Sequence, residues 1–391
     1  MINSSINSSG GISGYFSKSK DTIINKNILK IIASLKSLQH RGNNYWGFGF
    51  DYNDQISVIK NNGIVKNIYS EIEKNNFLPI STIGYVSDNN EPIIYLPNKE
   101  ALLVLNIENP IKEDYDNIVK ILDSNEKSLL KNLTGMIEEN SDLFKKIYNI
   151  AILKSNNLYL YRCENGRKPL LIGEDKETYY FSNESKTFKI LGGEMIREII
   201  AGELLKINSE GIKIIKEGKN ENEKFCSMEL CHILDMDTNL GILNINQFRN
   251  DFAILMAERD IGKFGEDDSI VCGFPNQAII PGITYAQFLG IPYGQFILKD
   301  QKVNDEIIYE SLVRNKIVIV VFTILIIDEY FNILLEKLKD YGVKEIHIRV
   351  LSPQIKGFDN ANNNLITSIN FLRRKILDLS IKRKLEHSFF A

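Results

Sequence analysis

The sequence is poor in cysteine, and no cysteine occurs before Cys163. The four thiols form no CxxC pair, so the spacing that marks zinc sites and thioredoxin-like redox sites is absent. Without an export signal we expect the thiols to stay reduced, which argues against a disulfide framework. The cysteines are Cys163, Cys226, Cys231 and Cys272.

Long apolar runs are also missing. The longest, from Ile317 to Ile327, includes Thr323 and is far shorter than the roughly 20 residues that span a bilayer. We therefore predict a buried strand there. Residues 1–9 have neither the basic nor the apolar part of a signal peptide, so we expect a disordered lead and a cytoplasmic protein.

The sequence lacks a strong excess of charge of either sign, with 47 basic and 50 acidic residues and a net charge of -3. We therefore expect no overall attraction to nucleic acids or acidic membranes. Residues 371–391 are a local exception and predict a basic C-terminal helix. That helix could contact a partner helix or RNA, although a docked terminal helix with a solvated face is the favoured interpretation.

Hydrophobic residues make up 43% of the 391 residues, which is enough for more than one domain core. Residues 10–216 alternate short β-rich runs with amphipathic helices, which indicates a sheet-rich α/β layer structure. Residues 217–225 are polar and aperiodic and predict a linker. In residues 226–370 continuous apolar strands alternate with helices, one of them predicted from Asn246 to Phe264. This pattern is typical of a parallel, doubly wound sheet that binds ligands beyond the carboxyl ends of its strands.

Several separated motifs in this chain resemble those of one family. They are Gly10–Gly14, Leu38–Gly42 (LQHRG), Ile83–Val86, Asn165–Leu170 and Gly342–Arg349. In this order they resemble the amidophosphoribosyltransferases, glutamine amidotransferases of purine biosynthesis whose nucleophile is an N-terminal cysteine. The resemblance covers most of the chain and implies an N-terminal-nucleophile amidohydrolase-like αββα sandwich followed by a phosphoribosyltransferase-like parallel-sheet domain.

The glutaminase site that the resemblance implies has lost its reacting groups. The nucleophile position is matched by Gly10, which has no thiol. Arg41 and Asn106 remain as glutamine-site positions, but Ile107 replaces the glycine whose amide would complete the oxyanion hole. Residues 87–90 also replace the Arg-Tyr-Ser-Thr that contacts glutamine in the family. Arg41 could still bind a carboxylate, although a structural role at the turn is the favoured interpretation.

The implied phosphoribosyl site is altered as well. Phe322 and Thr323 stand where the family has two acidic residues that contact ribose, and Asp328 falls in the phosphate-binding turn. Residues 275–280 lack the glycine and hydroxyl groups of the pyrophosphate loop. Lys299 is the residual phosphoribosyl-site position, although a solvated surface lysine is the more common case.

The resemblance also raises the question of a metal cluster, because some bacterial members hold an iron–sulfur cluster on four cysteines. Cys226 matches the first ligand, whereas Gly357–Asp359 lies where the next ligand is expected. One matching thiol does not make a cluster, so we predict no cofactor and no metal. Cys226 and Cys231 are predicted to be buried apolar side chains.

Three functions fit these observations. The first is a pseudoenzyme that has lost both catalytic centres and acts by protein binding, as part of a homo-oligomer or a larger assembly. The second is an active or residual amidophosphoribosyltransferase that makes phosphoribosylamine. The third and weaker one is a small-molecule sensor in which an emptied pocket accepts a different ligand.

Overall fold

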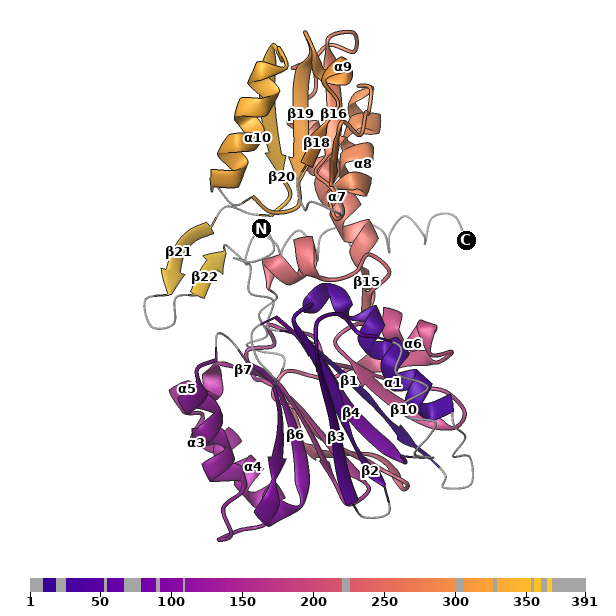
Figure 1. Ribbon diagram of the computed structural model, residues 1–391, viewed down its shortest axis with the longest axis vertical. Coiled ribbons are helices and arrows are strands. Elements are labelled where there is room, and N and C mark those ends of the chain that lie inside the picture. Colours follow the sequence, from indigo (N-terminus) through magenta and orange to yellow (C-terminus); the bar gives the residue numbers. More distant parts are fainter. Residues whose placement is uncertain are drawn as a thin grey trace. The chain divides into compact units, whose positions relative to one another are not determined.

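A computed structural model describes residues 10–18, 26–52, 55–66, 79–88, 92–107, 110–219, 226–299, 306–325, 329–352, 355–359 and 364–367. The chain forms two compact units, drawn in Figure 1. Of the described residues, the first unit contains 10–219 and 233–245, and the second contains 226–232 and those from 246 onwards. The predicted lead, most of the predicted linker and the predicted basic helix lie outside the described residues.

The first unit is built on two antiparallel sheets, because every strand pairing within each sheet is antiparallel. The larger sheet has the spatial order β11 (Glu194–Glu198), β9 (Leu171–Glu174), β10 (Thr178–Ser182), β1 (Gly11–Ser17), β4 (Ser81–Ser87), β2 (Tyr45–Tyr52), β3 (Gln55–Asn62). The smaller sheet has the order β13 (Gly211–Lys216), β12 (Leu204–Asn208), β8 (Asn157–Arg162), β7 (Ile147–Lys154), β6 (Ala101–Ile107), β5 (Ile93–Leu96).

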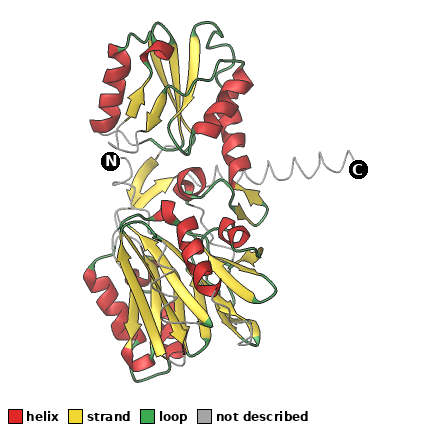
Figure 2. Cartoon of the chain, turned by 45° about the vertical axis from the view of Figure 1, so that its right-hand side comes forward, coloured by secondary structure: helices red, strands yellow, loops and turns green. Residues whose placement is uncertain are grey.

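The two sheets share a hydrophobic core, to which the larger sheet contributes Ile12 and Ile83 and the smaller one Val104 and Leu153. Helices cover both outer faces, as Figures 1 and 2 show. Alternate residues of β7, such as Ile152, therefore face a second core under the helices. Burial on both faces explains why these strands are apolar throughout, and the layer order is the expected αββα sandwich.

The helices of the first unit lie on different sheets. On the larger sheet lie α1 (Lys26–Ser37), the 3₁₀ turn η2 (Gln39–Arg41) and α6 (Lys186–Ile190). On the smaller sheet lie α3 (Lys112–Leu122), α4 (Leu129–Glu139) and α5 (Asp142–Lys145). The 3₁₀ turn η3 (Pro97–Lys99) joins β5 to β6, and the short hairpin β14 (Asn239–Leu240) with β15 (Leu243–Asn244) completes the unit.

The second unit contains the predicted parallel sheet. Its strands are β16 (Ser269–Gly273), β19 (Ile317–Phe322) and β20 (Glu345–Val350), with β19 in the middle and both pairings parallel. The helices are the π-helical turn η5 (Glu229–Ile233), α7 (Ile245–Glu258), α8 (Ile279–Leu289), α9 (Glu310–Val313) and α10 (Glu329–Asp340). The second unit also contains two antiparallel hairpins. They are β17 (Ile297–Lys299) with β18 (Glu306–Ile308), and β21 (Ile355–Asp359) with β22 (Asn364–Thr367).

Two predicted elements are shorter than expected. The apolar run from Ile317 ends as a strand at Phe322, and the next side chain, Thr323, is hydrogen-bonded to His232. The helix predicted to reach Phe264 ends at Glu258, and the chain then turns through Gly262, whose φ is +75°. Among the described residues, no helix is both long and apolar enough to cross a membrane.

Candidate functional site

Gly10 lies directly before β1, and its backbone suits glycine alone. Its φ is +79°, and a Cβ atom built on it would lie 2.5 Å from the carbonyl oxygen of Val86. An L-residue is strained in this left-handed region and would also meet that oxygen. At the position that matches the family's cysteine, both the backbone conformation and the surrounding atoms therefore disfavour any side chain.

Asn106 approaches Gly10 from the smaller sheet, since its Nδ2 atom donates to the Gly10 carbonyl oxygen over 3.4 Å. The structure thus brings two of the predicted site positions together. Its neighbour Ile107 is the last residue of β6, and its buried side chain packs into the core under α3 and α4. The position predicted to match the glycine of an oxyanion hole is therefore held by a strand residue that belongs to the core.

The carbonyl oxygen of the Asn106 side chain is buried without a hydrogen-bond donor among the described residues. The same is true of Asn149, which pairs with Asn106 across β6 and β7. Asn149 donates only through Nδ2, to the carbonyl oxygen of Pro169 at 3.4 Å. A buried polar atom without a partner costs about 1–3 kcal/mol, so each of these two oxygens carries an energetic cost in the described structure.

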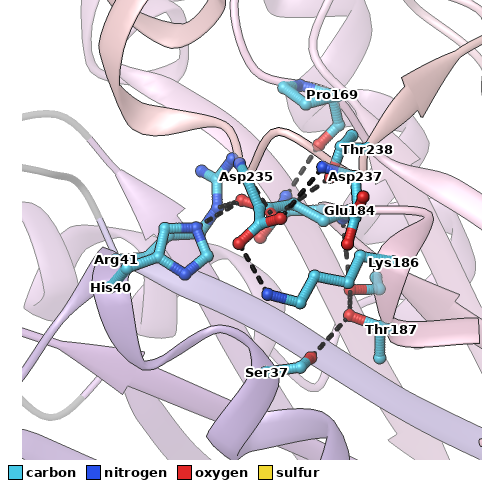
Figure 3. A network of polar contacts seen from close by, with 12 residues as sticks. Ser37, His40, Arg41, Pro169, Glu184, Lys186, Thr187, Asp235, Asp237 and Thr238 are labelled. Atoms are coloured by element: carbon cyan, nitrogen blue, oxygen red, sulfur yellow. Dashed lines mark hydrogen bonds and ion pairs between the residues drawn. The ribbon is translucent and has the colours of Figure 1, made fainter. Parts of the chain in front are cut away.

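Arg41 lies on the face of the larger sheet that points away from the smaller sheet. A Cβ atom built on Gly11 would lie 3.0 Å from Cδ of Arg41, and successive residues of a strand point to opposite faces. The side chain is fully buried, and its Nε atom donates to Oε1 of Glu184 over 2.5 Å, as Figure 3 shows. His40 contacts the same oxygen through Nε2 at 2.8 Å. The two residues of the LQHRG motif are therefore joined to an internal carboxylate.

Glu184 is the centre of a buried network (Figure 3). Its second oxygen accepts hydrogen bonds from the backbone N–H of Asp235 at 3.3 Å and the hydroxyl of Thr238 at 3.2 Å. Burial opposes ionisation of this carboxyl group, but the charges and hydrogen bonds of Arg41 and His40 outweigh burial and lower its pKa to about 2. Glu184 is thus an ionised residue whose partners are all internal.

Glu184 is not among the site residues predicted from the sequence. The available signal was an acidic residue two positions after β10, which ends at Ser182. The neighbouring Lys186 makes an ion pair with Asp235 at 2.5 Å, and the hydroxyl of Ser185 accepts from the N–H of Asn239 at 2.7 Å. Residues 184–186 therefore hold the segment that follows the predicted linker against the first unit.

In the second unit, aromatic rings fill the carboxyl end of the middle strand. Phe322, the last residue of β19, stacks on Phe274 with ring centroids 4.6 Å apart and planes inclined by 20°. It also meets Phe331 of α10 edge-on at 6.1 Å. Phe322 is 4% exposed, so the place where a doubly wound sheet normally binds its ligand is occupied by packed side chains.

The polar residues around this strand end bind one another. Thr323 is hydrogen-bonded to Nδ1 of His232 at 2.7 Å. Burial and the nearby charge of Arg249 lower the pKa of His232 to about 4, so the imidazole is neutral near pH 7. Gln277, from the loop that matches the pyrophosphate loop, accepts a hydrogen bond of 2.7 Å from Arg249.

Lys299 ends β17 with an exposed side chain and lies opposite Glu306 in the hairpin. Of the two thiols predicted to be buried, Cys231 is buried and Cys226 is half-buried. Within the described ranges, no group of three or more His, Cys, Asp and Glu residues is arranged to hold a metal ion. Asp328 lies outside the described residues.

No protein-family model matches the chain. It is similar to the amidophosphoribosyltransferase of Bacillus subtilis, with 24% identity over 363 residues, or 82% of this chain and 75% of that protein. It is also similar to the amidophosphoribosyltransferase of Archaeoglobus fulgidus, with 23% identity over 82% of this chain and 79% of the relative.

Two solved structures match nearly the whole fold. One is the glutamine phosphoribosylpyrophosphate amidotransferase of B. subtilis complexed with ADP and GMP, with a TM-score of 0.76 and 20% identity over 94% of this chain and 89% of that chain. The other is described as the allosteric regulatory enzyme of purine biosynthesis, also with a TM-score of 0.76 and 20% identity. The chain therefore resembles the amidophosphoribosyltransferases along most of its length, and it has the fold of glutamine phosphoribosylpyrophosphate amidotransferase, a nucleophile-hydrolase sandwich followed by a phosphoribosyltransferase domain.

Proposed function

We propose that this chain is an amidophosphoribosyltransferase-like pseudoenzyme. It hydrolyses no glutamine, transfers no phosphoribosyl group, and acts in the cytoplasm by binding protein, as a subunit or accessory factor. The observation that carries the proposal is the backbone of Gly10, with its φ of +79° and the Val86 oxygen 2.5 Å from any Cβ atom. Besides the thiol, the site therefore lacks a backbone conformation and the space that a cysteine side chain would need.

The surroundings of Gly10 support the same conclusion. Arg41, the residual guanidinium, is bound to Glu184, so a substrate carboxylate would have to displace a buried ion pair. Breaking such a pair costs about 3–5 kcal/mol, which is more than one new ion pair at the surface of a pocket returns. Arg41 is better explained as a structural residue that stabilises the turn η2, in which it lies.

The second unit supports the loss of phosphoribosyl transfer. Binding ribose and its phosphates at β19 would require Phe322 to leave the ring stack with Phe274 and Phe331. Moving a buried phenylalanine out of a core costs about 1.5–3 kcal/mol in apolar burial alone, before the packing of its neighbours is considered. Thr323, at the second of the two matched positions, has no carboxylate, and its hydroxyl is already hydrogen-bonded to His232.

The proposal is tested by assaying the purified full chain for phosphoribosylamine formation, with glutamine and separately with ammonia as nitrogen donor. The B. subtilis relative serves as the positive control in the same assay. Calorimetry with phosphoribosyl pyrophosphate and Mg²⁺ then measures binding without turnover. We expect no product and no heat of binding, and either signal above background would show that a catalytic centre survives.

An active or residual transferase is the alternative, and it requires binding of phosphoribosyl pyrophosphate in that same titration. The sensor hypothesis has one observation in its favour, the unsatisfied oxygens of Asn106 and Asn149. A small ligand with hydrogen-bond donors would satisfy both. Glutamine and ammonium chloride are suitable probes, and such binding would raise the melting temperature of the wild-type chain but not that of Asn149→Leu.

A further inference from the structure

Asparagine is followed by glycine at two places in this chain, Asn62–Gly63 and Asn165–Gly166. In this dipeptide the backbone nitrogen of glycine can attack the side-chain amide carbon of asparagine, because glycine has no side chain to obstruct the approach. The φ of the glycine is positive in both, +82° at Gly63 and +61° at Gly166. The two dipeptides differ in what holds them.

Asn62 is the last residue of β3, an edge strand of the larger sheet, and it is exposed. Within the described part of the chain, its side-chain amide makes no hydrogen bond. Gly63 is open as well, since nothing lies within 4 Å of a Cβ atom built on it. Its N–H donates to the carbonyl oxygen of Asn44 over 2.8 Å, so the attack by this nitrogen has to break that bond.

The dipeptide at Asn165 is held more firmly. The Oδ1 atom of Asn165 accepts a hydrogen bond from the N–H of Arg167 at 3.2 Å. The carbonyl oxygen of Gly166 accepts another, of 2.7 Å, from the buried guanidinium of Arg162. Gly166 is itself buried, and its N–H donates to the carbonyl oxygen of Cys163 at 3.0 Å. Bringing the two reacting atoms together would require this turn to give up these contacts.

We propose that Asn62 is a site of spontaneous deamidation that loosens the turn of the LQHRG motif. The nitrogen of Gly63 bonds to Cγ of Asn62, the bond from Cγ to Nδ2 breaks, and Nδ2 leaves as ammonia with the proton of the Gly63 N–H. Water then opens the cyclic imide to aspartate or isoaspartate. The imide nitrogen carries no hydrogen, so the bond to Asn44 is lost when the ring forms. In the isoaspartate product the main chain runs through the side chain and is one carbon atom longer.

The main chain after Gly63 is tied to the LQHRG turn. The N–H of the buried Val65 donates to Oε1 of Gln39 over 2.6 Å, and Nε2 of Gln39 donates to the carbonyl oxygen of Gly42, also over 2.6 Å. An extra main-chain atom before Gly63 displaces the Val65 N–H from this bond. We therefore expect the turn that carries Arg41 to open more often in the isoaspartate form.

The test is incubation of the purified full chain at mildly alkaline pH, followed by trypsin digestion and mass spectrometry. Trypsin releases the two dipeptides in separate peptides, residues 61–66 and 163–167, because each peptide follows and ends at a basic residue. We expect Asn62 to deamidate at least about tenfold faster than Asn165, because the turn around Asn165 has more hydrogen bonds to lose. In a chain unfolded by urea the two should react at similar rates, since the fold no longer restrains either.

Asn62→Gln is the matched variant, because glutamine has to close a larger ring and reacts more slowly. Hydrogen exchange of the Val65 amide should become faster in the incubated wild-type chain and stay unchanged in incubated Asn62→Gln. Circular dichroism verifies that both chains remain folded. Equal rates at Asn62 and Asn165 in the folded chain, or the same preference in the unfolded chain, would overturn the proposal. Unchanged exchange at Val65 in a chain that has deamidated would likewise overturn it.

Discussion

Restoring the missing thiol tests whether Gly10 is a lost nucleophile or a position rebuilt around glycine. In Gly10→Cys, the left-handed φ of +79° costs about 1–2 kcal/mol for an L-residue. The new Cβ atom also lies 2.5 Å from the Val86 oxygen, closer than real Cβ contacts, and relieving such overlap typically costs about 1–3 kcal/mol. We therefore expect a loss of about 2–5 kcal/mol in the free energy of unfolding and no glutaminase activity.

Gly63 provides the control, because its φ is +82° and nothing lies within 4 Å of an added Cβ atom. Gly63→Cys should lose only the backbone part, about 1–2 kcal/mol. Urea denaturation of both variants, followed by circular dichroism, measures the difference, and a coupled assay of glutamate release measures hydrolysis. Equal stability of the two variants would refute the steric argument. Glutamate release by Gly10→Cys would refute the claim that the site lacks more than a thiol.

Three further predictions concern the buried network, the buried histidine and the aromatic stack. Glu184→Gln should lower the free energy of unfolding by about 3–5 kcal/mol, because Arg41 would stay buried without its counter-ion. The pKa of Glu184 is lowered from 4.5 to about 2 in the folded chain, so its contribution should be full above pH 4.5 and fall between pH 4.5 and 2. A stability profile in which Glu184→Gln keeps the wild-type acid slope would contradict this. His232, whose pKa is lowered from 6.5 to about 4, should cost stability as the pH falls from 6.5 to 4, because the unfolded chain takes up the proton first. An NMR titration of its ring should then give a midpoint near 4, and a midpoint near 6.5 would disprove its burial. Phe322→Ala should cost about 3–5 kcal/mol in thermal unfolding and still bind no phosphoribosyl pyrophosphate, whereas a stable variant that binds would show that the ring alone closes the site.

The fold was predictable because its signals are local. The apolar composition of segments such as β7 and β19 predicts buried strands, and the glycines of the motifs predict turns. Element ends were less predictable. The helix predicted to reach Phe264 stops at Glu258 because Asp260 is held in the core by Arg349 and Tyr285, residues that are far away in the sequence.

The sequence by itself determined which family the chain resembles and that Gly10 carries no thiol and Phe322 no carboxylate, because a residue's type is visible position by position. It could not determine what replaced them. The partner of Arg41 is Glu184, 143 residues further along the chain, and no periodicity links two side chains so far apart. Only the tertiary structure brings them together, because burial of one charge demands a second one beside it.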